Sequence, residues 1–222
     1  MLASPSSMTP PRGVLFVASD VDPVHDQDYN RWYDREHVLE RVRIPGFVSG
    51  TRYVAIDAPK RYLGLYHTES LAVFDTEAYR QAFQHQTPWS VSNLGRMQAP
   101  KRRVCQVLAR TGAGQGSALV VIELAVGGSA EALDQQARVL GAELAAADGF
   151  VQSCLYLPEA ALSTPLPQES TEGRVLHPML LIHTSSPAAA QTLREQALAQ
   201  LGAAGAASSL YALGWHLHAA DL

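Results

Sequence analysis

The sequence predicts an α+β fold of two tandem βαββαβ units, and three observations support this prediction. Residues 45–54 recur as residues 148–157, with Gly, Phe, Val and Tyr repeated in register at an offset of 103 residues. The same order of strand-like and helix-like segments surrounds both copies, as expected for an internal structural repeat. The 222 residues are also enough for two small units with a stable core.

Each unit is expected to contain six elements in the same order, which is the split-βαβ pattern of ferredoxin-like folds. For the first unit these are a strand at 14–18, a helix at 27–43, strands at 48–56 and 61–67, a helix at 76–86 and a strand at 103–109. For the second unit they are a strand at 119–124, a helix at 130–146, strands at 151–157 and 176–183, a helix at 187–201 and a strand at 209–216. Gly46 and Gly149 follow the first helix of each unit, where glycine accepts the positive φ of a helix end.

The two units should cover one another. A four-stranded antiparallel sheet with helices on one face leaves its other face bare, and a second such sheet is the natural cover. We therefore expect two ferredoxin-like sheets packed face to face. The predicted boundaries are a disordered tail at 1–12, a first unit at 13–110, a Gly-rich linker at 111–116 and a second unit, mainly scaffold, at 117–222. Residues 163–173 are expected to form an exposed loop.

Composition argues against several classes of protein. The formal net charge of −4 gives no electrostatic case for binding nucleic acid or an anionic membrane. No apolar run approaches the ~20 residues of a transmembrane helix, and the N-terminal residues lack the pattern of a signal peptide. Cys105 and Cys154 lie in strand-like segments of different units and are expected to be buried free thiols. These features predict a cytoplasmic protein.

The first unit carries most of the chemically useful side chains. Twelve of the 16 aromatic residues and 14 of the 17 Lys and Arg residues precede position 111. When the two units are aligned without gaps at the offset of 103 residues, polar residues of the first unit align with apolar residues of the second. Glu36, His37, Arg41 and Arg52 align with Val139, Leu140, Leu144 and Leu155, respectively. If the units share a fold, these polar residues face the sheet. Because burying charge without partners is costly, they should pair with one another, with tyrosine hydroxyls or with a ligand.

The helix expected at 27–43 arranges these groups in columns. Residues one turn apart form two neighbouring columns, Tyr33–His37–Arg41 and Trp32–Glu36–Glu40. On the strand expected to face this helix, Tyr62, Gly64 and Tyr66 share one side. A glycine between two tyrosines there predicts room for a ligand.

These residues carry a resemblance to a known superfamily. Asn30-x-Trp32-Tyr33-x-x-Glu36-His37, followed by Arg41 and Pro45-Gly46-Phe47, resembles the helix-and-turn signature of dimeric α/β-barrel proteins, nearest to EthD-like proteins and their bacterial relatives. The resemblance is specific over residues 27–66 and rests on the fold pattern elsewhere. It implies ferredoxin-like sheets packed face to face as a pseudodimeric α/β barrel, a pocket between a sheet and its helices, and His37 as the catalytic or ligand-contacting residue. The superfamily includes cofactor-free monooxygenases, muconolactone-type isomerases, polyketide cyclases and heme enzymes.

The catalytic candidates are His37, Glu36 and Arg41. A neutral His37 would transfer a proton near neutral pH, and Glu36, if desolvated beside Trp32, would be a second acid or base. Arg41 or Arg52 would stabilise an enolate or phenolate oxygen, although both are also expected to pair with Glu36 or Glu40. The substrate-binding candidates are Trp32, Tyr33, Arg52, Tyr62 and Tyr66. No HExxH or CxxC motif occurs, so no dedicated metal site is expected.

The sequence therefore favours an enzyme that acts on an apolar or aromatic small molecule by cofactor-independent acid/base chemistry. Isomerases, lyases, cyclases and cofactor-free monooxygenases are the matching reaction types. Two alternatives stay open: a non-catalytic protein that binds a hydrophobic ligand or assists a catabolic pathway, and a heme-binding protein. A tandem chain can close its own barrel and can still form a homodimer.

Overall fold

The computed structural model describes residues 12–222. The strands are β1 (Gly13–Val21), β2 (Phe47–Asp57), β3 (Tyr62–Thr68), β4 (Met97–Gly112), β5 (Ala118–Leu124), β6 (Phe150–Pro158), β7 (Met179–Thr184) and β8 (Gly205–His218). The α-helices are α1 (Asp26–Trp32), α2 (Val38–Val42), α3 (Glu77–Gln84), α4 (Pro88–Gly95), α5 (Ala130–Leu144) and α6 (Pro187–Leu201). A π-helical turn, η2 (Tyr33–His37), joins α1 to α2, and short 3₁₀ turns are η1 (Pro23–His25), η3 (Leu71–Asp75), η4 (Gly202–Ala204) and η5 (Ala219–Asp221).

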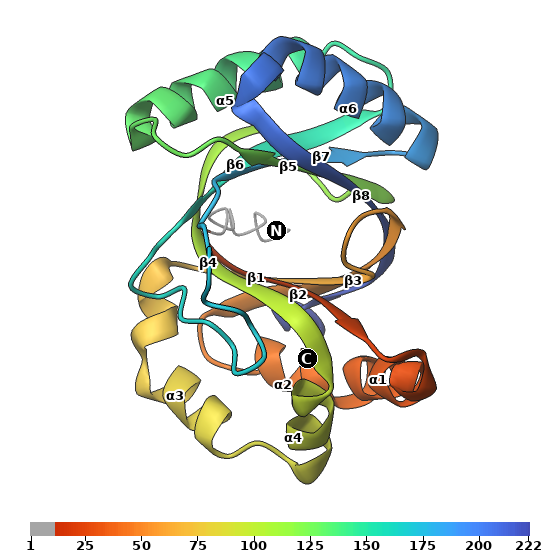
Figure 1. Cartoon of the computed structure of the whole chain (residues 1–222), viewed down its shortest axis with the longest axis vertical. Coiled ribbons are helices and arrows are strands. Elements are labelled where there is room, and N and C mark those ends of the chain that lie inside the picture. Colours follow the sequence, from red (N-terminus) through yellow and green to blue (C-terminus); the bar gives the residue numbers. More distant parts are fainter. Residues whose placement is uncertain (1–11) are drawn as a thin grey trace, which may run out of the picture.

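The eight strands form one closed antiparallel barrel in the order β1-β3-β2-β8-β5-β7-β6-β4 (Figure 1). Each unit contributes four neighbouring strands in the ferredoxin-like order, β4-β1-β3-β2 and β8-β5-β7-β6. The last strand of each unit is long and pairs with both units: β4 with β1 and β6, and β8 with β5 and β2. The prediction of two ferredoxin-like units in a pseudodimeric barrel is confirmed, and hydrogen bonds join the two sheets at both edges.

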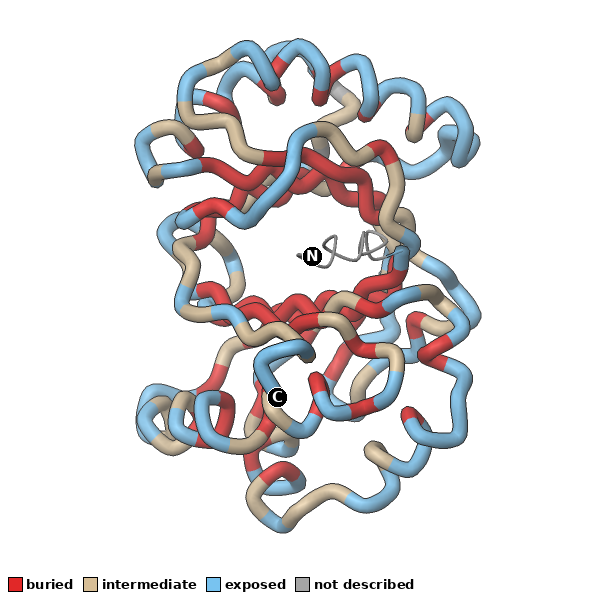
Figure 2. Tube along the Cα trace, turned by 180° about the vertical axis from the view of Figure 1, so that it is seen from behind, coloured by how far each residue is buried: buried red, intermediate tan, exposed pale blue. Residues whose placement is uncertain are grey.

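The barrel wall separates three apolar cores. Helices α5 and α6 cover the sheet of the second unit, and α1 to α4 cover the sheet of the first unit on the opposite side (Figure 1). Strand residues alternate accordingly: in β1, Phe16 packs inside the barrel and Leu15 packs against the helices. Figure 2 shows the buried residues along the barrel strands and the exposed ones on the outer helical surfaces. In the described part of the chain, no helix is long and apolar enough to cross a membrane.

The turn glycines and the cysteines agree with the predictions. Gly46 and Gly149 have φ values of 88° and 81°, so both provide the positive φ expected at a helix end. Cys105 and Cys154 are buried free thiols. Both belong to the core inside the barrel.

Several predicted boundaries are corrected by the structure. Residues 1–11 of the predicted tail lie outside the described residues, but Arg12 already bonds to β3 through the carbonyl of Thr68. The predicted linker at 111–116 begins too early, because β4 continues through Thr111 to Gly112 and pairs there with β6. The helix α4 was not predicted, although Thr87 followed by Pro88 is an N-cap with proline at the first helical position, a recognised helix start.

The loop predicted to be exposed at residues 163–173 is largely anchored to the first unit. Ser163 and Glu169 are buried, with 1% and 8% of their surface exposed. The Ser163 hydroxyl accepts a hydrogen bond from the backbone N–H of Val104 in β4 at 2.9 Å. Eight of the eleven residues at 163–173 are exposed, as predicted for a loop rich in Pro, Gly and polar residues. The prediction missed only that Ser163 and Glu169 anchor the loop to partners distant in sequence.

Candidate functional site

A column of buried residues at every fourth position runs along the first helical segment of the first unit, beside the buried Trp32, Val38 and Val42. Tyr29, Tyr33, His37 and Arg41 are at most 5% exposed. An α-helix has 3.6 residues per turn, so residues four apart rotate progressively away from a common face. The π turn η2 widens the helix between Tyr33 and His37, and Val38 N–H bonds to the carbonyl of Tyr33, five residues earlier. This turn keeps the column on the sheet-facing side, and π turns occur frequently at functional sites.

The second unit shows what the π turn adds. Its helix α5 buries Leu133, Ala137, Leu140 and Leu144. The interval from Leu133 to Leu140 is one residue shorter than the interval from Tyr29 to His37. The π turn therefore corresponds to one residue inserted in the first unit. The offset of 103 residues between equivalent buried positions holds only from His37 onward, at the end of this turn.

His37 lies in an aromatic cluster at the centre of this column. Its ring centroid is 4.2 Å from that of Trp32, 5.0 Å from that of Tyr33 and 5.9 Å from that of Tyr66. One turn further, the Arg41 guanidinium lies 4.4 Å from the centre of the Phe83 ring in α3. The side chains of Tyr33, His37, Arg41 and Tyr66 line a cavity of about 30 Å³ between the helices and the outer face of β1 and β3. The cavity has room for about one or two water molecules.

Three buried polar atoms in this cavity have no hydrogen-bond partner among the described residues. They are His37 Nδ1, Arg41 Nη1 and the hydroxyl oxygen of Tyr66. Buried polar groups are nearly always hydrogen-bonded, so such a group in a folded protein needs an explanation. Three of them around one cavity indicate a place for a polar ligand group.

The electrostatic environment fixes the protonation of two of these groups. Burial, followed by the positive charges of Arg41 and Arg52, lowers the pKa of His37 well below its ordinary value. Burial, followed by the neighbouring Tyr33 phenol, raises the pKa of Tyr66 well above its ordinary value. At neutral pH the cavity therefore presents an uncharged imidazole beside two proton donors, the Arg41 guanidinium and the Tyr66 hydroxyl.

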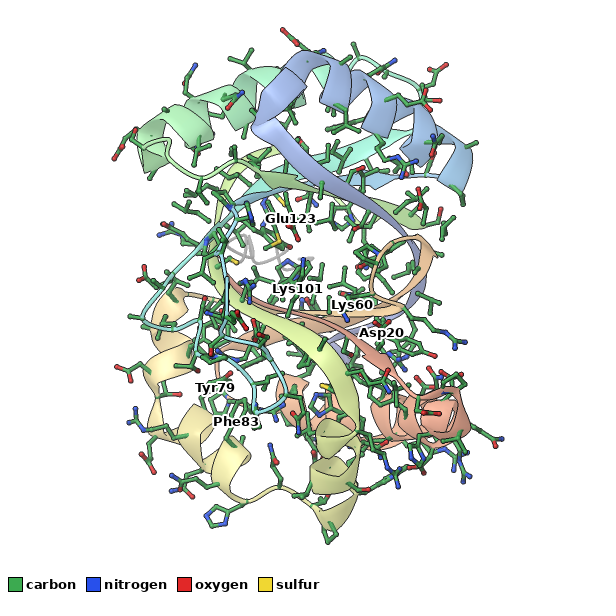
Figure 3. All side chains as sticks on the ribbon, viewed as in Figure 1. Asp20, Lys60, Tyr79, Phe83, Lys101 and Glu123 are labelled. Atoms are coloured by element: carbon green, nitrogen blue, oxygen red, sulfur yellow. The ribbon has the colours of Figure 1, made fainter. Side chains whose placement is uncertain are left out.

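A larger groove adjoins the cavity. It has a volume of about 430 Å³ and lies between α3 and residues 161–167 of the second unit, and it shares Phe83, Arg102 and Leu166 with the cavity. Tyr79 and Phe83 extend from the side of α3 that faces the sheet (Figure 3). Arg102 fixes both walls, because its guanidinium donates to Leu162 O at 2.8 Å and to the Tyr79 hydroxyl at 3.2 Å. The groove is therefore large enough for a small ligand, and it has a wall in common with the small cavity at His37.

Glu169 holds the second unit's loop in this position. Its carboxylate accepts hydrogen bonds from Arg103 and Arg174 and from the backbone N–H of Arg102. Burial alone would raise the pKa of Glu169, but the bonds from Arg174 and Arg103 lower it below its ordinary value. The second unit thus supplies a wall of the site, which goes beyond the predicted role as scaffold.

The structure gathers only part of the predicted site around the cavity. His37, Arg41, Tyr33 and Tyr66 line it. Trp32 packs behind the His37 ring, and its indole N–H donates to Ser90 Oγ at 3.0 Å. The glycine gap predicted at Gly64 holds no ligand space, because the Tyr66 ring lies over it, 3.2 Å from the position a Cβ would take.

Glu36 does not face the sheet, so this prediction was wrong. Its carboxylate accepts hydrogen bonds from Thr87 Oγ1 at 2.5 Å and Ser90 Oγ at 3.0 Å, at the start of α4. The alignment of the two units explains the error. Val139, which aligns with Glu36, is 50% exposed, whereas Leu140 and Leu144, which align with His37 and Arg41, are buried. Glu36 therefore anchors a helix and is separated from the predicted chemistry.

Arg52 and Tyr62 form a neighbouring polar cluster outside the cavity. Arg52 bonds to Asp34 at 3.2 Å, not to Glu36 or Glu40 as predicted, and its guanidinium lies 4.0 Å from the centre of the Tyr33 ring. The Tyr62 hydroxyl donates to Asp26. The Tyr33 ring lies between Arg52 and the cavity, so Arg52 acts on His37 through its charge.

Sequence reasoning missed Phe83, Arg102 and Leu166. Arg102 alternates with the buried Val104 on the helix side of β4, a two-residue period that could have identified it. Phe83 lies one turn after Tyr79 on the buried side of α3, a helical spacing that was also available. Nothing local marks Leu166, which reaches the site from the other unit.

Comparisons with known proteins identify the fold. No model of a known protein family matches the chain, and no protein of curated function is detectably similar to it in sequence. Among solved structures, an anthrone oxidase-like protein superposes with a TM-score of 0.65 at 15% identity, over 96% of this chain and 95% of the other. A proposed monooxygenase from Fusobacterium nucleatum gives a TM-score of 0.57 at 8% identity, over 95% and 96% of the two chains. A proposed monooxygenase from Lactobacillus acidophilus gives a TM-score of 0.56 at 7% identity, over 94% of this chain and 97% of the other.

The chain shares with these neighbours the fold of two ferredoxin-like sheets closed into one α/β barrel. At identities of 15% or less, the similarity shows the fold alone. Nothing in the comparisons points to EthD-like proteins in particular, so that closer resemblance stays a prediction.

Proposed function

We propose that this protein is a small-molecule enzyme that removes a proton from an apolar or aromatic substrate without a cofactor. The observation that carries the proposal is the set of three unpartnered polar atoms, on His37, Arg41 and Tyr66, around one buried cavity. A base and two donors for an oxyanion are the groups that such a reaction needs. The apolar part of the substrate would lie in the groove. Because the cavity itself holds only about 30 Å³, Phe83 and Leu166, which line both spaces, would have to move apart to admit the reacting atoms.

His37 Nδ1 would accept the proton from an acidic C–H or O–H group of the substrate. The resulting enolate or phenolate oxygen would receive hydrogen bonds from Arg41 Nη1 and the Tyr66 hydroxyl. The low pKa of His37 stems from burial and from the charges of Arg41 and Arg52. An oxyanion beside Arg41 would offset that positive potential, so the imidazolium would be stabilised when the substrate loses its proton.

This proton transfer is the common first step of isomerisation, lyase-type cleavage, cyclisation and cofactor-free oxygenation. The structural neighbour described as anthrone oxidase-like makes anthrone a rational first probe. Anthrone is an apolar aromatic ketone that becomes a phenolate-type anion when its methylene group loses a proton. The test is deuterium exchange at this methylene group without oxygen, followed by oxygen uptake in air.

We expect the wild-type protein to accelerate the exchange and His37→Ala to slow it by about 100-fold or more, the usual contribution of a general base. His85→Ala is the matched control, because His85 is exposed in the same unit. Equal exchange rates for wild type and His37→Ala would remove His37 from the mechanism. Saturable anthrone binding without exchange would support the non-catalytic alternative, and a lack of both would reject anthrone-type substrates.

A heme does not fit beside His37. Its ring packs against Trp32, Tyr33 and Tyr66, and the adjoining space is only about 30 Å³. The proposed mechanism accordingly has no step at a heme. An absorption spectrum after heme addition tests the heme-binding alternative, and a Soret band that His37→Ala abolishes would favour it.

A further inference from the structure

A second pocket lies at one mouth of the barrel, on the other side of the sheet from His37. Inside the barrel, the apolar residues of β3 and β7 give way to histidine at the strand ends: Leu65 is followed on the same face by His67, and Leu181 by His183. Six strands and the segment between β4 and β5 contribute to this pocket, which has a volume of about 340 Å³. That volume is within the usual range for small-ligand sites, about 300–1,000 Å³.

The pocket has a built polar lining. His67 Nε2 lies 2.8 Å from the Tyr156 hydroxyl, and His216 Nδ1 lies 2.8 Å from Thr51 Oγ1. His183 is 5% exposed, and its Nδ1 atom has no hydrogen-bond partner in the part of the chain that the structure describes. An unpartnered buried nitrogen in the wall of a pocket indicates a position for a ligand atom.

The charge of this lining is positive. Arg110 is the charged side chain that lines the pocket, and no carboxylate among residues 12–222 does so. Its Nη1 donates to Gln152 Oε1 at 2.7 Å, which fixes the guanidinium at the wall. Burial, followed by the charge of Arg110, lowers the pKa of His183 to about 4. Burial, followed by the neighbouring His183 and Arg110, lowers the pKa of His67 to about 3. Within residues 12–222, no group of His, Cys, Asp and Glu side chains is placed to hold a metal ion.

We propose that this barrel-mouth pocket binds a small organic carboxylate, with the carboxylate at Arg110 and His183 and the apolar body against Val48, Cys154 and Tyr156. Arg110 provides the opposite charge, and the unpartnered His183 Nδ1 provides a hydrogen bond to the same group. This site is separate from the cavity at His37, because the two lie on opposite faces of the barrel wall. The inference therefore does not depend on the proposed enzymatic function.

The test is calorimetric titration of the whole protein with naphthoate, an aromatic carboxylate, and with naphthamide, its uncharged analogue. We expect naphthoate to bind at one site, and both the Arg110→Gln variant and the amide to bind at least about tenfold more weakly. Lys101→Gln is the matched control, because Lys101 is a basic residue at the opposite barrel mouth, paired with Glu123 (Figure 3). Equal affinity of Arg110→Gln and wild type, equal affinity for acid and amide, or no saturable binding would each overturn the proposal.

Arg110 bonds to Gln152, so its replacement could prevent folding, and the wild-type protein provides an independent test. Its histidine ring signals can be followed by NMR and assigned with His67→Gln and His183→Gln. Naphthoate should shift the His67 and His183 signals and raise both pKa values, because a bound anion favours the protonated imidazole. The signal of exposed His85 should stay unchanged. Shifts confined to His37 would place the anion in the other cavity and overturn the proposal.

Discussion

At the scale of single residues, the cavity beside His37 is unfavourable for folding. A buried polar group that loses its hydrogen bond costs about 1–3 kcal/mol, and three such groups meet here, on His37, Arg41 and Tyr66. Replacing them with apolar residues would fill the space better, as Leu140 and Leu144 do in the second unit. Retention of the three polar groups in one unit is therefore more readily explained by ligand chemistry than by stability.

Tyr66→Phe tests this interpretation. Because the buried Tyr66 hydroxyl has no hydrogen-bond partner among residues 12–222, its removal should leave the free energy of unfolding unchanged or raise it by about 1 kcal/mol. Tyr156→Phe is the control, since its hydroxyl bonds to His67 at 2.8 Å and its loss should cost about 1 kcal/mol. Urea unfolding measures the change in the free energy of unfolding for both variants. A destabilised Tyr66→Phe variant would mean that the hydroxyl is satisfied in the folded protein.

At the scale of elements, the groove depends on a loop that belongs to the other unit. Residues 161–167 form one wall, and the loop is held by the buried carboxylate of Glu169 between Arg103 and Arg174. Removing one partner of a buried ion pair leaves the remaining charges unpaired, which is costly. The position of this wall is therefore sensitive to a single side chain.

Glu169→Gln should lower the free energy of unfolding by about 2–3 kcal/mol, because glutamine keeps one acceptor oxygen but not the negative charge. Hydrogen exchange in residues 161–167 should also become faster, since the loop loses its anchor. Glu172→Gln is the matched control, because Glu172 is exposed in the same loop. Unchanged exchange in Glu169→Gln would show that the Arg102 bonds alone hold the groove wall.

Elements were more predictable than the contacts between them. Residue periodicity and turn glycines are local signals, and they identified the strands and the main helices of both units. The pairing of β4 and β8 with strands of the other unit has no local signal, because any strand with the right pattern could pair there. In the same way, the repeat located His37 and Arg41 at buried positions, whereas the cavity roof at Leu166 depends on the folded chain.

At the scale of the whole molecule, the barrel interior makes stability depend on pH. His183 is buried at the barrel mouth, and burial, followed by the charge of Arg110, lowers its pKa to about 4. In the unfolded chain a histidine has a pKa of about 6.5. As the pH falls from about 6.5 to about 4, the unfolded chain takes up a proton at this position before the folded protein does. Acidification across this window must therefore favour unfolding.

The predicted size of this effect follows from the two pKa values. Between about pH 8 and pH 5, His183 should account for a loss of about 2 kcal/mol in the free energy of unfolding. Urea unfolding of wild type and His183→Gln at both pH values measures it, and the variant should lose about 2 kcal/mol less than wild type. His85→Gln should keep the wild-type dependence, because His85 is exposed. If His183→Gln kept the wild-type pH dependence as well, His183 would take up its proton as readily in the folded barrel as in the unfolded chain. Its environment could then not be the buried position beside Arg110 described above.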